Sequence, residues 1–97
     1  MIRHSVIFSL KHAAGSTEET AFLRDAKAAL TPIPGVEKFE QLRQVSEKND
    51  YAFGFSMEFA DRAAYAAYDA HPNHVAFVRD RWVPEVAKFL EIDYEPL

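Results

Sequence analysis

The 97-residue sequence contains no cysteine. This absence excludes disulfide bonds, thiolate catalysis and zinc–thiolate sites. It also has no run of lysine or arginine, and its net charge is −4, so it lacks the basic face of a nucleic-acid-binding module or of a protein that docks on anionic lipid. No apolar run approaches transmembrane length, and the first residues do not have the basic-then-apolar pattern of a signal peptide. We therefore expect a cytoplasmic protein without nucleic-acid or membrane partners.

Several signatures of catalytic chemistry are also missing. The sequence has no glycine-rich phosphate loop, no nucleophile elbow and no paired-carboxylate pattern. Nucleotide hydrolysis and covalent catalysis are therefore poorly supported.

Aromatic residues are abundant, in contrast. Hydrophobic residues make up 48% of the chain, with eight Phe and four Tyr, which is enough for a folded core. We predict one domain over residues 1–97. A chain of this length buries only about 60–65% of the surface that its unfolded form exposes, so a second subunit would add stability.

Hydrophobic periodicity predicts four strands. Residues 2–10 alternate, with His4 on the same face as its apolar neighbours, and residues 51–59 alternate between bulky and small side chains. Residues 36–46 favour a strand with a bulge. Residues 89–94 alternate Leu90, Ile92 and Tyr94 against acidic residues that we interpret as a solvated strand face: Glu91, Asp93 and Glu95.

Capping patterns predict two helical regions between these strands. Ser16 to Glu19 forms a capping box that opens the first helix, which ends at prolines 32 and 34. Asp61 caps the second helical region, which Pro72 divides in two and Pro84 ends or kinks. The order β-α-β-β-α-β predicts an α+β ferredoxin-like fold with helices on one face of an antiparallel sheet. The other face is left uncovered, so we predict a homodimer formed sheet to sheet.

The break between the two later helices concentrates polar rings. Pro72 forces the arriving helix to end near His71 and is well placed to begin the next helix, whose first turn then contains His74. The helix dipole disfavours protonation of a histidine there, so His74 can act as a base. Tyr68 could hydrogen-bond a carbonyl oxygen as negative charge develops on it. His4 points into the same interior, and we predict a pocket polarised by His4, Tyr68 and His74.

These residues also resemble a known family. The initial Arg3-His4, the His71-Pro72-x-His74-Val75 segment followed by Phe77, and the closing Ile92-Asp93-Tyr94 look like the stress-responsive dimeric α/β-barrel (Dabb) family. The resemblance implies a ferredoxin-like subunit and a homodimer whose two sheets form a barrel. One plant branch, similar to olivetolic acid cyclase, closes a linear polyketide by an intramolecular aldol condensation. The resemblance assigns the base to His74, assisted by Tyr68 and His4, whereas Phe53 replaces a histidine of that cyclase and makes the pocket more apolar.

The residues and the resemblance together leave three functions open. The first is cofactor-free enolisation, cyclisation or isomerisation of a small apolar carbonyl compound. The second is non-enzymatic binding or a stress-assembly role, and the third is a haem-degrading or quinol monooxygenase, a type of chemistry found in related dimers. His71 and His74 at the helix break, together with His4, could suggest a metal site. The sequence spacing places no carboxylate ligand beside them, so no metal or other cofactor is expected. The predicted pocket lining is His71, Phe53, Phe55, Phe77, Val78 and Trp82.

Overall fold

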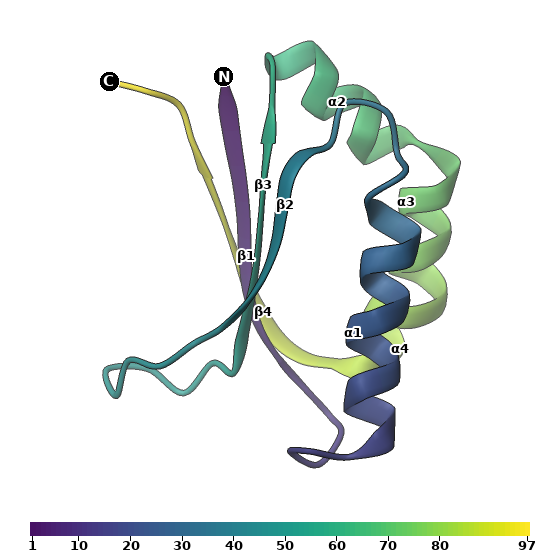
Figure 1. The fold of residues 1–97 in the computed structure, drawn as a ribbon, viewed down its shortest axis with the longest axis vertical. Helices are drawn as coiled ribbons and strands as arrows, with labels where there is room; N and C mark the ends of the chain where they lie inside the picture. Colours follow the sequence, from purple (N-terminus) through teal and green to yellow (C-terminus); the bar gives the residue numbers. More distant parts are fainter.

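The computed structural model describes residues 1–97, which form one sheet covered by helices on a single face (Figure 1). The elements are β1 (Ile2–Leu10), α1 (Thr17–Leu30), β2 (Glu37–Arg43), β3 (Phe53–Phe59), α2 (Arg62–Ala70), α3 (Pro72–Phe77), a π-helix η1 (Val78–Trp82), α4 (Val83–Glu85) and β4 (Val86–Tyr94). The sheet is antiparallel, with strand order β2-β3-β1-β4. The predicted α+β ferredoxin-like fold is confirmed.

The alternation in β1 and β3 decides which side of the sheet becomes the core. His4 pairs with Met57, Val6 with Phe55, and Phe8 with Phe53. Paired residues in an antiparallel sheet point to the same face, so these rows form the floor beneath the helices. Gly54 and Ile7 pair on the opposite, open face.

The facing of β4 differs from the sequence-based prediction. The strand begins at Val86, and its register pairs His4 with Asp93 and Val6 with Glu91. Glu91 and Asp93 therefore lie on the helix-covered side, whereas Leu90, Ile92 and Tyr94 lie on the open face. Alternation alone does not say which set points inward; the pairing of β4 with β1 decides it.

Side-chain caps hold the helix ends at the predicted places. The Ser16 hydroxyl accepts from the Glu19 N–H, and the Asp61 carboxylate accepts from the Ala64 N–H. The break at Pro72 is confirmed: α2 ends at Ala70, and the His71 side chain accepts a hydrogen bond from the Asn73 N–H as it caps α3.

The π-helix after α3 has no counterpart in the predicted elements. In η1 the Val83 N–H donates to the Val78 carbonyl, five residues earlier. Val78, Trp82 and Val83 all border the same interior space. Such π-turns are rare and are found often at functional sites.

The predicted bulge in β2 is confirmed. The pairing of β2 with β3 shifts register between Glu37 and Glu40, and Lys38 has a φ of 51°. The shifted backbone brings the Lys38 ammonium to 3.0 Å from the Glu58 carboxylate, which also binds Arg3 at 3.1 Å. This ion cluster ties the edge strand to the centre of the sheet.

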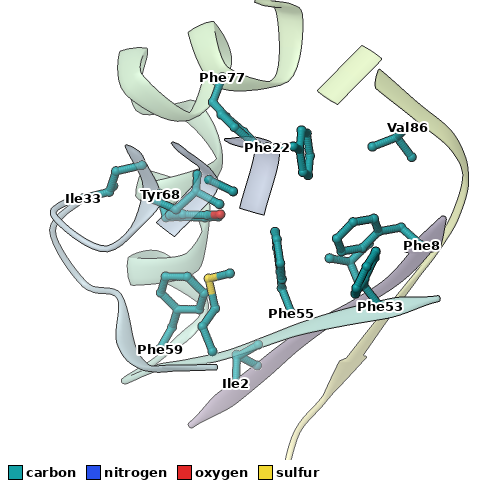
Figure 2. Packing of buried hydrophobic residues seen from close by; sticks show 14 residues of the cluster. Ile2, Phe8, Phe22, Ile33, Phe53, Phe55, Phe59, Tyr68, Phe77 and Val86 are labelled. Carbon is teal, nitrogen blue, oxygen red and sulfur yellow. The ribbon is translucent and has the colours of Figure 1, made fainter. Parts of the chain in front are cut away.

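Aromatic rings fill the space between sheet and helices (Figure 2). The Phe8 ring is fully buried, with its centroid 4.7 Å from that of Phe55, 6.0 Å from Phe22 and 4.9 Å from Trp82. This cluster joins β1, β3, α1 and η1. The cluster borders a cavity, which is lined by its members Phe55 and Trp82.

Candidate functional site

A cavity of about 480 Å³ lies between the inner face of the sheet and the helices. This volume is within the range of small-molecule sites, about 300–1,000 Å³. Eleven of its fifteen lining residues are hydrophobic. The complete lining is His4, Val6, Leu30, Phe55, Met57, Tyr68, Asp69, His74, Phe77, Val78, Trp82, Val83, Val86, Phe89 and Glu91.

The cavity brings together most of the residues predicted from the sequence. His4 reaches it from β1, Tyr68 from α2 and His74 from α3, and the predicted apolar residues Phe55, Phe77, Val78 and Trp82 also line it.

Phe53 and His71 do not line the cavity, which corrects the predicted lining. Phe53 lies on β3 beside Phe8, with its ring centroid 5.7 Å from that of Phe8 (Figure 2), whereas the cavity reaches this row on the β4 side, where Phe89 pairs with Phe8 and lines the cavity. The His71 ring is turned to the start of α3, where its Nδ1 accepts from the Asn73 N–H at 3.1 Å.

Tyr68 supplies an unpartnered hydroxyl to the cavity. Its side chain is 2% exposed, and Figure 2 shows the hydroxyl directed toward the interior of the aromatic cluster. No protein group hydrogen-bonds this hydroxyl, and since every fully enclosed polar side-chain atom has a partner, the oxygen borders the open space. Burial, followed by the charges of Asp69 and Glu91, raises the pKa of Tyr68. The group is therefore a protonated hydrogen-bond donor at neutral pH.

His74 is oriented by the end of α2. Its Nδ1 lies 2.9 Å from the Asp69 carbonyl oxygen. Because a carbonyl only accepts, Nδ1 carries the hydrogen, and the neutral ring has its lone pair on Nε2. The ring centroid is 4.6 Å from that of Tyr68. The helix break thus places a basic nitrogen and a hydroxyl donor at one end of the cavity.

His4 is held by two residues that the sequence analysis did not connect to it. Its Nδ1 is 2.6 Å from the Asp93 carboxylate and 3.1 Å from the Tyr65 hydroxyl. Burial, followed by the charge of Asp93, raises the pKa of Tyr65, which therefore is protonated at neutral pH. The carboxylate at Nδ1 favours the tautomer with a hydrogen on that nitrogen, which leaves Nε2 as the acceptor.

One of these two missed residues has a local signal in the sequence. Tyr65 precedes Tyr68 by three positions, so both lie on one face of a helix. Asp93 becomes a neighbour of His4 once β4 is aligned antiparallel to β1, a pairing that the alternation of β4 alone does not specify.

No group of three or more His, Asp or Glu side chains is arranged to hold a metal ion. No helix is long and apolar enough to cross a membrane.

The chain folds as a ferredoxin-like α+β domain. It has a four-stranded antiparallel sheet with helices on one face, and a polarised apolar cavity lies between these two layers. The chain belongs to the stress responsive A/B barrel domain (Dabb) family, whose model matches residues 2–96.

Solved structures agree with this assignment. A Dabb family protein with a ferredoxin-like fold from Mesorhizobium loti is 71% identical, with a TM-score of 0.98 over 99% of this chain and 96% of that one. A protein from Arabidopsis thaliana is 26% identical, with a TM-score of 0.86 over 100% and 96% of the two chains. A dimeric ferredoxin-like protein of unknown function from Bacteroides fragilis is 21% identical, with a TM-score of 0.74 over 98% and 95%, and it shares the fold. A search of curated proteins found no match.

Proposed function

We propose that the cavity binds a small, largely apolar carbonyl compound, and that His74 and Tyr68 promote its enolisation without a cofactor. One observation carries this proposal: the unpartnered Tyr68 hydroxyl and the His74 ring, centroids 4.6 Å apart, both border the same cavity. The apolar lining suits the body of such a ligand, and the polar end suits its carbonyl oxygen.

The proposed step is a balanced proton transfer. Nε2 of His74 takes a proton from the carbon next to the carbonyl; the electron pair of that C–H bond forms the C=C bond of the enolate, and the π pair of the carbonyl moves to its oxygen. The Tyr68 hydroxyl donates a hydrogen bond to this oxygen as it becomes negative. The imidazolium then returns the proton to a carbon of the enolate, which gives isomerisation, or the enolate carbon attacks a second carbonyl of the same molecule and the imidazolium protonates the new alkoxide, which gives cyclisation.

His4 has an orienting role in this proposal. Its contact with the Asp93 carboxylate at 2.6 Å leaves Nε2 free to accept a hydrogen bond from a ligand hydroxyl or a water in the cavity. The Tyr65 hydroxyl, 3.1 Å from Nδ1, limits rotation of the ring. Asp93 is thus a positioning residue that acts through His4.

Hydrogen–deuterium exchange tests the chemistry without a known substrate. We expect the protein to accelerate exchange of the α-protons of 4-phenylbutan-2-one in D₂O, measured by NMR. His74→Ala should return the rate to that of buffer and leave the melting temperature within a few degrees. His71→Asn is the matched control, because it removes an imidazole at the same helix break and retains a good helix cap. Equal rates for wild type and His74→Ala would contradict the proposed base.

Ligand binding without catalysis is the second candidate function, and the predominantly apolar lining favours it. Under that function, 4-phenylbutan-2-one should bind wild type and His74→Ala with similar affinity, and neither protein should accelerate exchange. The two candidates are therefore separated by measuring binding and exchange on the same pair of proteins.

The open face of the sheet supports a homodimer. Leu42, Leu90 and Tyr94 are exposed there at 49%, 48% and 54%, beside the half-buried Ile7 and Ile92. Covering this apolar surface would stabilise the subunit, and the related Bacteroides protein is described as dimeric. Light scattering after size-exclusion chromatography should give twice the subunit mass, and Leu90→Asp should shift it toward the monomer. A wild-type monomer at micromolar concentration would exclude this assembly.

A further inference from the structure

We infer that the cavity selects its ligand by charge: it accepts apolar compounds with an uncharged or protonated-amine end and rejects carboxylates. The inference rests on the proposed function in that it concerns the ligand of the same cavity. It adds a substrate class that the acid–base pair does not specify.

The charged groups in the cavity wall all carry the same sign. Asp69 and Glu91 line the cavity, and Asp93 lies directly behind His4. No lysine or arginine is among the lining residues. A ligand carboxylate would therefore approach at least two negative groups without a fixed cation to balance them.

Cations on other parts of the chain already have carboxylate partners. Arg62 pairs with Glu95 at 3.0 Å, and Lys88 pairs with Asp50. Arg81 binds Asp25 at 2.6 Å. Glu91, an exposed residue of the cavity lining, has no ion pair or hydrogen bond with the protein, so only solvent and salt screen its charge.

The buried hydroxyl of Tyr68 is the second observation that points to a ligand. It is a donor without a partner, on a side chain that is 2% exposed, and it faces the same space as the two carboxylates. The charges of Asp69 and Glu91 contribute, after burial, to raising the pKa of this hydroxyl. Both carboxylates therefore act on the interior of the cavity as well as on the surrounding solvent, and a ligand that carries its own carboxylate is disfavoured beside Tyr68, whereas the enolate of the proposed step forms together with the His74 imidazolium.

The opposite arrangement is favourable for a cation. A protonated amine beside Glu91 would gain an ion pair, whereas its apolar body would occupy the pocket formed by Phe55, Phe77 and Val78. An uncharged carbonyl would accept a hydrogen bond at the polar end of the cavity, and an alcohol would accept or donate one there, without an electrostatic penalty. The expected order of affinity is amine, then alcohol, then carboxylate.

Trp82 provides the measurement. It is the only tryptophan in the chain and it lines the cavity, so its fluorescence reports occupancy. We would titrate the full chain at low salt with 3-phenylpropylamine, 3-phenylpropan-1-ol and 3-phenylpropanoate, which share one body and differ in charge. The carboxylate should bind about tenfold more weakly than the alcohol, and the difference should narrow as salt screens the wall charges.

Variants that remove one charge from the cavity wall test whether Asp69 and Glu91 cause the weaker binding of the carboxylate. Glu91→Gln and Asp69→Asn should each raise carboxylate affinity by about threefold and leave the affinity for the alcohol unchanged. Glu47→Gln is the matched control, since it removes one negative charge from an exposed loop away from the cavity. A carboxylate that binds as tightly as the alcohol, or a preference that survives both wall variants together, would overturn the charge inference and leave the proposed function standing. Failure of all three compounds to bind would overturn both.

Discussion

Replacing Tyr68 by Phe tests whether the hydroxyl of this residue serves the proposed reaction or the stability of the fold. The change keeps the ring, which lies 5.0 Å from Phe59 and 4.6 Å from His74 between centroids, and deletes one oxygen. Tyr65 is the matched control on the same helix: its ring lies 5.2 Å from Phe59, but its hydroxyl contacts His4 at 3.1 Å. The two substitutions remove the same atom from two environments that differ in hydrogen bonding.

The structure predicts opposite effects on stability and activity. The Tyr68 hydroxyl has no protein partner, so Tyr68→Phe should change the free energy of unfolding by less than about 0.5 kcal/mol or raise it. Tyr65→Phe removes a contact with His4 and should cost about 1 kcal/mol, which corresponds to a fall in melting temperature of about 4–8 °C for a domain of this size. Tyr68→Phe should nevertheless slow α-proton exchange of 4-phenylbutan-2-one by about a hundredfold, because the developing oxyanion loses its donor.

The assay is urea and thermal unfolding of wild type and both variants at one protein concentration, followed by exchange kinetics on the same samples. A fixed concentration is needed because subunit association would shift the apparent stability. If Tyr68→Phe destabilises the protein more than Tyr65→Phe does, its hydroxyl supports the fold. If exchange is unchanged in Tyr68→Phe, that hydroxyl does not stabilise the reacting oxygen.

Further substitutions and conditions test other parts of the structure. Phe8→Ala should lower the free energy of unfolding by about 3–5 kcal/mol in urea titrations, since the ring is fully buried in the aromatic cluster; a loss below 1 kcal/mol would contradict that packing. Asp93→Asn should weaken the orientation of His4 and alter the pH profile of exchange while leaving affinity for 4-phenylbutan-2-one nearly unchanged; identical profiles would argue against a positioning role. Hydrogen bonds from Lys38 and Arg3 lower the pKa of Glu58 from its ordinary value of 4.5. Its charge therefore stabilises the folded state fully above that value, and this contribution is lost as the pH falls through the folded pKa. Glu58→Gln should accordingly be less stable than wild type at pH 7, with the difference vanishing in acid-unfolding titrations; a constant difference across pH would contradict the ion cluster. A Soret band on titration with haem would favour the monooxygenase function over the one proposed here.

Local pattern was sufficient for the backbone elements because their determinants are close in sequence. The caps at Ser16 and Asp61 and the break at Pro72 depend on side chains within a few residues of the backbone groups that they satisfy. Alternation in β1 and β3 placed His4 on the inner face. The π-helix was missed because hydrophobic periodicity does not distinguish its hydrogen bond from Val83 to Val78, five residues earlier, from the four-residue bonds of an α-helix.

The cavity required long-range information. The pairing of β4 with β1 decides that Asp93 meets His4 and that Glu91 enters the cavity wall. Phe53 lies on the other side of β1, on β3, whereas Phe89 of β4, which pairs with Phe8, lines the cavity. A contact between residues so far apart in the sequence leaves no local signal in the pattern, since either face of an alternating strand can be turned inward.

By itself, the sequence determined the order of the elements, the family and the helix break that positions Tyr68 and His74. These follow from periodicity, capping and the geometry of proline, all of which act within one or two helical turns. The tertiary structure alone decided which face of β4 points inward, and so gave His4 its carboxylate partner and the cavity its negative wall. The physical reason is that the facing of a strand is set by its hydrogen-bonded register with a neighbouring strand that can lie far away in the sequence, as for His4 and Asp93, which are 89 residues apart.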